Sequence, residues 1–113
     1  MFNTLHAMFM DQYTEQWNAL DVIAERIRAL GVIAPGSYDE YKQLTAIPTH
    51  VGTPKAMEMV AQLLAAQEAT ARTARDLLPL VTEANDQPTT DLLTERLDVH
   101  EKTAWMLRSL LED

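Results

Sequence analysis

Apolar residues recur every three or four positions in three long stretches of the chain, which is the spacing of one face of an α-helix. The first stretch covers roughly residues 4–30, with Asn3 or Thr4 as a suitable N-cap and Gly31 just after its end. The last stretch covers residues 87–111 and follows a polar segment that contains Asp86, a possible N-cap. These patterns predict an all-α chain.

The second stretch is expected to begin with Thr53 as the N-cap and Pro54 at the first helical position. Its apolar positions continue to about residue 83. Pro79 falls inside this pattern and lacks a backbone N–H. A kink, or an early end near Leu78, is therefore expected.

The segment from residue 32 to 53 is a long connection punctuated by proline and glycine. In its middle, Ser37 is followed three residues later by Glu40, the spacing of a capping box. This predicts a short helix from Ser37 to Leu44. The long connection lets the first two long helices lie parallel, whereas the short connection near residues 85–88 makes the last two antiparallel neighbours.

A length of 113 residues suits a single domain covering residues 1–113. The chain is 47% hydrophobic, enough for a core, and it shows no internal repeat or low-complexity tract. Three long amphipathic helices leave a bundle incomplete, and the first of them has apolar positions on more than one side. We expect another copy of the chain to complete the bundle.

The net charge of −8 repels the phosphates of nucleic acid and the anionic face of a membrane, so direct binding to either is not expected. The chain has no cysteine, which excludes disulfides and cysteine-based metal sites. No apolar run approaches the ~20 residues of a membrane span, and residues 1–10 lack a basic leader. These features predict a cytoplasmic protein.

The first candidate for chemistry is a pair of carboxylates, Asp21 and Glu25, which lie four residues apart and so share one helical face. A cation could bind there. Such pairs are more often a solvated acidic face, here with Arg28 as a neighbour, and that interpretation stays open.

His6 lies on the same predicted helix and offers an imidazole suited to iron or zinc. It is fifteen residues from Asp21, which corresponds to ~22 Å along the axis and is too far for one metal site. Two chains paired antiparallel about a two-fold axis near residues 13–16 would bring His6 of one beside Asp21 and Glu25 of the other. The ordinary alternative is that His6 is a packed or capping residue.

Other residues have simpler interpretations. The His-x-Met-x-Met spacing from His6 to Met10 could suggest copper, but alternate helical positions diverge. His100 and Trp105 are expected to be packing or interface residues. The side chains expected to fill gaps in the core are Met8, Met57, Met59 and Met106.

Five segments of the chain match a known family: FNTLH at residues 2–6, DVIAERIRALG at 21–31, PGSY at 35–38, TDLLTER at 90–96 and HEKTAWMLR at 100–108. Together they resemble the Dps family, the small ferritins named for DNA protection during starvation, over nearly the whole chain. The resemblance implies a ferritin-like bundle that assembles into a twelve-subunit shell. It also implies oxidation of ferrous iron with hydrogen peroxide and storage of the ferric product.

In that family the iron centre lies between two-fold related subunits, and His6, Asp21 and Glu25 fall on its ligand positions. The family has an acidic residue four positions after the histidine, where this chain has Met10, a soft and neutral ligand. The printed chain also begins where the family's second bundle helix begins, so the first helix, with a further histidine ligand, is not in it. These departures predict weak or absent ferroxidase activity and a rearranged homo-oligomer, such as a dimer formed by helix exchange.

Asp86, Asp91 and Glu95 resemble the acidic residues that line the family's iron-entry pore, although helix capping explains Asp86 equally well. Our leading hypothesis is a Dps-like iron-binding mini-ferritin with an incomplete centre. The alternative is a non-catalytic helical scaffold that keeps only the two-fold packing.

Overall fold

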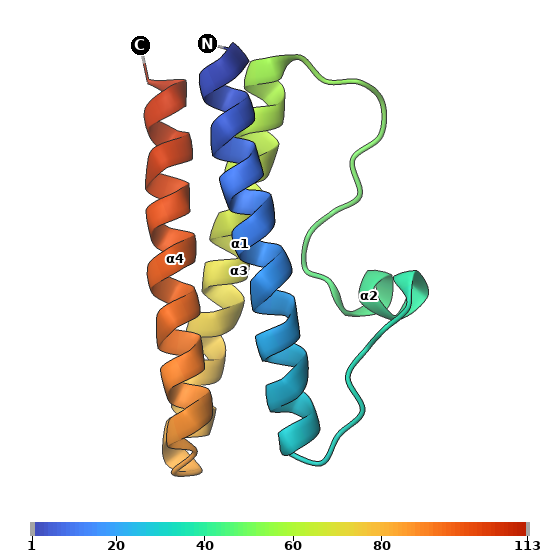
Figure 1. The fold of residues 1–113 in the computed structure, drawn as a ribbon, viewed down its shortest axis with the longest axis vertical. Helices are drawn as coiled ribbons and strands as arrows, with labels where there is room; N and C mark the ends of the chain where they lie inside the picture. The colour runs from blue at the N-terminus through green and yellow to red at the C-terminus, as the bar shows by residue number, and fades with distance from the viewer. Residues whose placement is uncertain (1, 113) are drawn as a thin grey trace. The chain divides into compact units, whose positions relative to one another are not determined.

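The computed structural model of the chain describes residues 2–112 and is built from helices (Figure 1). In chain order these are α1 (Phe2–Ala29), α2 (Tyr38–Leu44), α3 (Ala56–Glu83) and α4 (Gln87–Leu111). No strand occurs in this part of the chain. The predicted all-α architecture, with three long helices and a short one in the long connection, is confirmed.

The chain forms two compact units, one that ends at Leu44 and one that starts at Thr45. In the first unit, α1 ends in a Schellman motif: the N–H of Val32 donates to the carbonyl of Ile27 at 3.3 Å, and that of Gly31 to Arg28 at 3.0 Å. Gly31 has a φ of +93°, a conformation that glycine adopts without a steric penalty. This glycine therefore fixes where α1 ends.

The predicted capping box of α2 is present. The Ser37 hydroxyl accepts from the Glu40 N–H at 3.2 Å and donates to the Glu40 carboxylate at 2.9 Å. The same carboxylate accepts from the Gly36 N–H at 3.4 Å. These bonds satisfy donors at the start of the helix, which is why seven residues hold a helical conformation between two irregular segments.

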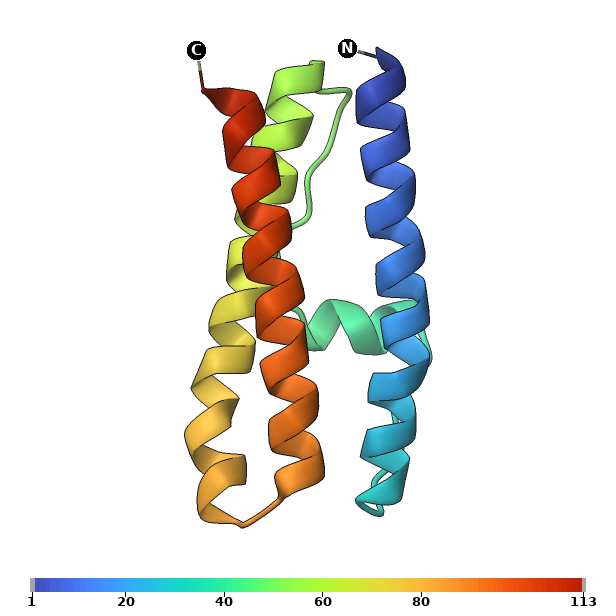
Figure 2. The ribbon, with the colours of Figure 1, turned by 60° about the vertical axis from the view of Figure 1, so that its left-hand side comes forward.

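In the second unit, α3 and α4 form an antiparallel hairpin (Figure 2). The turn contains Asn85 with a φ of 58°, and Asp86 follows as the N-cap of α4. Its carboxylate accepts from the Thr89 N–H at 3.1 Å. Several of the buried apolar residues of the hairpin are alanines, which allow the two backbones to approach closely. The buried apolar residues are Val60, Ala71, Ala74, Ala104 and Leu107.

The start of α3 differs from the prediction. Lys55, not Thr53, is the N-cap, and its side chain makes no capping bond. Its extended backbone, with φ −69° and ψ 162°, delays the helix until Ala56. The helix ends at Glu83, as the apolar pattern predicts. Of the two outcomes expected at Pro79, a kink or an early end near Leu78, the early end does not occur, because α3 continues through the proline. Proline removes a single hydrogen bond of the helix, and packing on α4 holds the turns on both sides.

Within residues 2–112, none of the helices combines the length and apolar character needed to cross a lipid bilayer.

Candidate metal site on the first helix

The predicted metal-binding residues all lie on α1, and each has an exposed side chain. At 3.6 residues per turn, His6, Asp21 and Glu25 fall within about 100° around the helix axis. His6 is nevertheless separated from the two carboxylates by the ~22 Å along the axis that fifteen residues span. Among residues 2–112, a single chain brings no three histidine, aspartate or glutamate side chains together as a metal site. One copy therefore carries His6 and the two carboxylates at opposite ends of one face.

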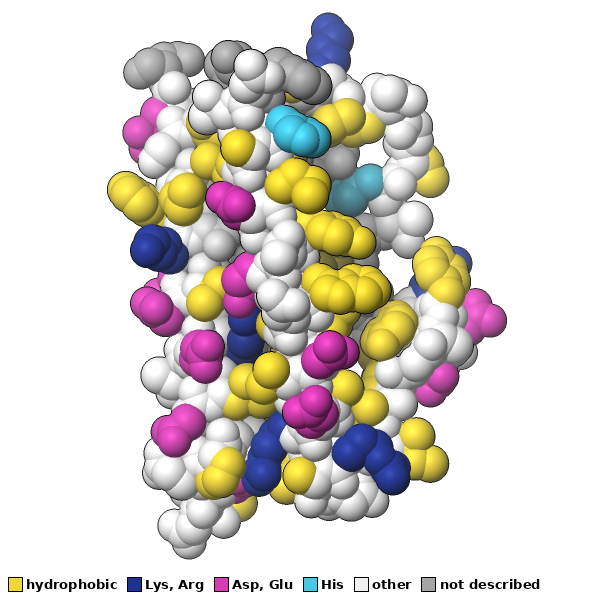
Figure 3. Space-filling view, in the orientation of Figure 1, with side chains coloured by type: hydrophobic (Ala, Val, Ile, Leu, Met, Phe, Trp, Pro, Cys, Tyr) yellow, Lys and Arg dark blue, Asp and Glu magenta, His cyan; other side chains and the backbone are white. Residues whose placement is uncertain are grey.

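The surface of α1 between these two ends is apolar and exposed. Two of its rings, Tyr13 and Trp17, stack with centroids 6.3 Å apart and planes 19° apart. Figure 3 shows hydrophobic side chains gathered along this helix. The exposed fractions are 50% for Met10, 64% for Tyr13, 61% for Trp17 and 52% for Leu20. We call these four residues the α1 stripe; in a single chain it leaves two large aromatic side chains in water.

The short helix of the same unit also exposes apolar side chains. Tyr38, Tyr41 and Leu44 recur every three residues along α2 and are all exposed. The Tyr41 hydroxyl donates to the carbonyl of Pro35 at 2.9 Å, which holds the ring in place. The first unit thus has uncovered apolar surface on both of its helices, a common property of protein interaction sites.

The methionines near His6 separate around the helix. Met10 is one turn after His6 and about 40° away around the axis, whereas Met8 is about 160° away. Met8 is half-buried, and Met10 is exposed. On the observed helix the side chains of His6 and Met8 therefore point in different directions, as predicted, and Met10 is the methionine of α1 that shares the face of His6. Asp11 projects about 100° from Met10 and does not replace it.

The three acidic residues that resemble those of an iron-entry pore lie at the N-cap and in the first turns of α4. Asp86 is occupied as the N-cap, since its carboxylate accepts from the Thr89 N–H and hydroxyl. Asp91 accepts a hydrogen bond from the Gln87 amide at 2.6 Å. Glu95 is exposed one turn further along and shares a face with Asp91. Capping of the helix by Asp86, as predicted, is confirmed.

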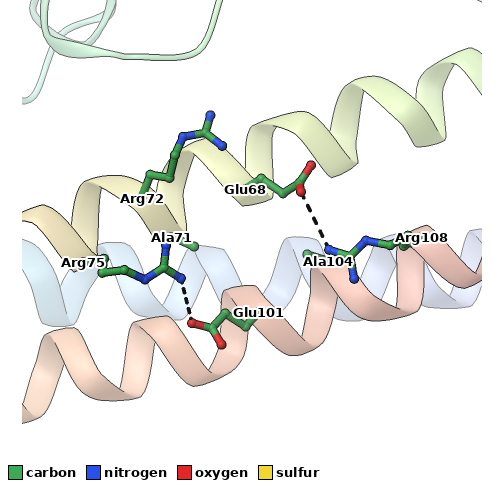
Figure 4. Close-up of a pocket in the computed structure, with 7 residues that line it drawn as sticks. All are labelled: Glu68, Ala71, Arg72, Arg75, Glu101, Ala104 and Arg108. Carbon is green, nitrogen blue, oxygen red and sulfur yellow. Dashed lines mark hydrogen bonds and ion pairs between the residues drawn. The ribbon is translucent and has the colours of Figure 1, made fainter.

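A charged groove of about 430 Å³ runs along the hairpin between α3 and α4. It is floored by two buried alanines (Figure 4). Arg75 of α3 pairs with Glu101 of α4 at 2.9 Å, and Arg108 of α4 pairs with Glu68 of α3 at 3.7 Å. Arg72 points away from both pairs (Figure 4). The lining residues are Glu68, Ala71, Arg72, Arg75, Glu101, Ala104 and Arg108.

These residues belong to a short repeat that the sequence analysis missed. The pattern Glu-x-Thr-Ala-x-x-x-Arg occurs at residues 68–75 and again at residues 101–108. Because the two helices are antiparallel, each glutamate meets the arginine of the other copy of the pattern. The repeat can be read from the sequence, but only the antiparallel hairpin shows that its glutamates and arginines pair across the two helices.

A buried polar chain also joins the two helices of the hairpin. Arg96 donates to Nε2 of His100 at 3.0 Å, and Nδ1 of His100 lies 2.6 Å from the amide oxygen of Gln67. Arginine only donates, so Nε2 is the acceptor and the proton of the neutral ring is on Nδ1. The exposed fractions are 3% for Gln67, 7% for Arg96 and 6% for His100. His100 is thus a packing residue, as predicted, with both ring nitrogens engaged.

The model of the ferritin-like domain family matches residues 1–113, so the chain belongs to that family. Within it, the chain belongs to the Dps family. It is 33% identical to DNA protection during starvation protein 2 of Bacillus anthracis, over 97% of this chain and 75% of that protein. The structure of DpsC from Streptomyces coelicolor superposes with a TM-score of 0.95 at 30% identity, over 99% of this chain and 66% of that one.

A low-temperature-induced protein of Nostoc is 39% identical over 98% of this chain. The chain spans 63% of the length of that relative. The Dps protein of Vibrio cholerae, which is described as a member of a superfamily of ferritin-like diiron-carboxylate proteins, superposes with a TM-score of 0.92 at 29% identity. That alignment covers 98% of this chain and 70% of the Vibrio chain.

Proposed function

We propose that two copies of this chain pair along α1 in antiparallel orientation and bind ferrous iron at each end of the pair. In each site, His6 of one copy meets Asp21 and Glu25 of the other. One observation carries the proposal: the imidazole and the two carboxylates lie at opposite ends of a single exposed face of α1. Antiparallel pairing is the arrangement that brings opposite ends of one helix together, and it does so twice per pair.

The α1 stripe supports this pairing. An axis near residues 13–16 falls beside the stacked rings of Tyr13 and Trp17, which are exposed in one chain and would cover each other in two. Burial of aromatic side chains is among the strongest contributions to an interface. The same contact that removes these rings from water would therefore assemble the metal ligands.

The donor atoms suit iron. Two carboxylates and one imidazole supply oxygen and nitrogen ligands that bind ferrous iron and leave coordination positions open for an oxidant. The three residues hold iron as substrate, and the carboxylates offset the charge that increases when ferrous becomes ferric iron. Met10 adds no anionic oxygen on this face, so we expect slower oxidation than a centre with a third carboxylate gives.

The relatives named for DNA protection during starvation, and the diiron-carboxylate superfamily of the Vibrio protein, favour iron oxidation and storage as the function. We propose that the chain uses hydrogen peroxide as the oxidant and protects cells against oxidative stress. The net charge of −8 makes direct contact with DNA unfavourable. If the pairs assemble further into a shell, Asp86, Asp91 and Glu95 would supply an acidic entrance for iron.

The test is an anaerobic titration with ferrous iron, followed by hydrogen peroxide. We expect saturable binding near one iron per chain and oxidation faster than in buffer. The double substitution Asp21→Asn and Glu25→Gln should abolish both. Asp76→Asn with Asp98→Asn is the matched control, because it removes the same charge from exposed positions on α3 and α4.

Two results would decide against the site. Unchanged iron binding after loss of Asp21 and Glu25 would show that the ligands lie elsewhere. Pairs that form normally but bind no iron would support the alternative of a non-catalytic scaffold.

A further inference from the structure

Met10 is the one methionine of α1 that shares the exposed face of His6, one helical turn away. In the pair proposed above, this places its thioether at the iron site. Thioether sulfur is a poor ligand for iron but is readily oxidised to the sulfoxide. The position therefore combines an oxidisable atom with a site that brings iron and peroxide together.

Three other methionines have similar exposure but lie far from α1 in the sequence. The exposed fractions are 50% for Met10, 41% for Met57, 43% for Met59 and 37% for Met106. The sequence pattern predicts that the last three fill the core, and the structure instead leaves them open to solvent. They belong to the second unit, on α3 and α4. Exposure alone therefore predicts similar oxidation at all four positions.

We propose that Met10 is a metal-directed oxidation site, at which iron bound beside His6 directs hydrogen peroxide to the Met10 sulfur. This inference rests on the proposed iron site. In the reaction, the O–O bond of peroxide breaks, an S–O bond forms, and the second oxygen leaves as water. The sulfur loses two electrons and peroxide gains them, so no further oxidant or reductant is needed.

The modification changes the chemistry of the site as well as consuming peroxide. A sulfoxide presents an oxygen atom in place of the soft sulfur, and oxygen is a donor that suits iron. Oxidation of Met10 thus exchanges a ligand unsuited to iron for one of the preferred type.

The experiment compares sulfoxide formation at each methionine by peptide mass spectrometry after brief exposure to limiting hydrogen peroxide. Without iron, Met10 should oxidise no faster than the three other methionines, because pairing along α1 covers part of the α1 stripe. With one equivalent of ferrous iron per chain, sulfoxide at Met10 should form several times faster than at Met57, Met59 and Met106. Equal enhancement at all four positions would overturn the inference, because it would indicate peroxide chemistry in bulk solution.

One variant and a separate binding measurement distinguish this inference from the proposed function. His6→Ala leaves Met10 and the rest of the α1 stripe unchanged but should remove the iron-dependent enhancement at Met10. Iron binding, measured in parallel by quenching of tryptophan fluorescence, tests the site independently of oxidation. Iron that binds through His6 but leaves Met10 no more reactive than Met57 overturns only this inference. Failure of iron to bind the unaltered chain overturns the proposed function as well.

Discussion

His100 shows how much one buried polar residue specifies in this hairpin. It is reached from two sides, by Arg96 of its own helix and by Gln67 of α3, and all three side chains are buried. Buried polar groups of this kind stabilise a structure only while each keeps its partner. The position of His100 on α4 is thereby tied to the position of Gln67 on α3.

His100→Leu should therefore lower the free energy of unfolding by about 1–3 kcal/mol, because it leaves the Gln67 oxygen and an Arg96 N–H buried without this partner. Urea unfolding followed by circular dichroism measures the change. The double variant Gln67→Leu with His100→Leu should recover part of the loss, since it removes the stranded amide as well. If the double variant loses more unfolding free energy than the two single variants lose together, the polar chain is not the cause.

Asp86 has two proposed roles that substitution can separate. Asp86→Ala removes the cap of α4 and should cost about 0.5–2 kcal/mol of stability. Asp86→Asn keeps an acceptor for the Thr89 N–H but removes the charge. It should keep most of the stability and, if Asp86 lines an iron entrance, should slow iron uptake in a stopped-flow assay. Equal uptake by the two variants and the unaltered protein would leave capping as the role of Asp86.

At the scale of elements, the repeated Glu-x-Thr-Ala-x-x-x-Arg pattern links α3 to α4. The two reciprocal ion pairs cross the groove in opposite directions, over a floor of Ala71 and Ala104. Both pairs are about half exposed, so water and salt weaken them. Their effect is therefore to favour one register of the antiparallel helices, while the buried residues supply most of the stability.

A double-mutant cycle on Arg75 and Glu101 should give a coupling energy of about 0.2–1 kcal/mol, and the same cycle on Arg108 and Glu68 a smaller one. The difference follows from the separations of 2.9 Å and 3.7 Å. Thermal unfolding at low and high salt measures both cycles, and high salt should reduce each coupling. Coupling that is unaffected by salt would contradict an electrostatic origin.

At the scale of the whole molecule, the first unit has an exposed apolar surface that a single chain leaves in contact with water. The α1 stripe and the apolar side of α2 together expose aromatic and aliphatic side chains. Soluble proteins with such a surface associate through it or aggregate. The proposed pairing would cover the α1 stripe and bring His6 of one copy to Asp21 and Glu25 of the other.

Trp17→Glu should break the pair, because it removes an aromatic anchor and places two like charges close to the two-fold axis. Loss of an interface hot spot of this kind costs about 2 kcal/mol or more, roughly a thirtyfold weaker association. Analytical ultracentrifugation over a range of concentrations measures it.

The matched control is Trp105→Glu on α4, whose ring is 60% exposed compared with 61% for Trp17. It should leave the pair intact. An equal loss of association in both variants would indicate non-specific apolar contact in place of the α1 pairing.

The sequence by itself determined the helices of this protein, because their signals are local. The bounds of α4 and the cap of α2 follow from apolar spacing and from single side chains such as Ser37 and Asp86. It also placed His6 and Asp21 on one helix, and hence predicted that one chain cannot close the site. The predicted start of α3 was wrong because local signals compete there. Thr53 and Pro54 suit the start of a helix, yet the extended backbone at Lys55 delays the helix until Ala56.

Only the tertiary structure decided which residues meet across the hairpin. Nothing in the sequence around His100 indicates that Gln67, thirty-three residues away, accepts a hydrogen bond from its ring, or that Arg75 faces Glu101. The tertiary structure also decided that Met57, Met59 and Met106 stay exposed and that the α1 stripe remains uncovered in one chain. Such contacts depend on how two helices are aligned in space, and burial depends on what packs against each face, so neither is encoded by the spacing of residues along a single helix.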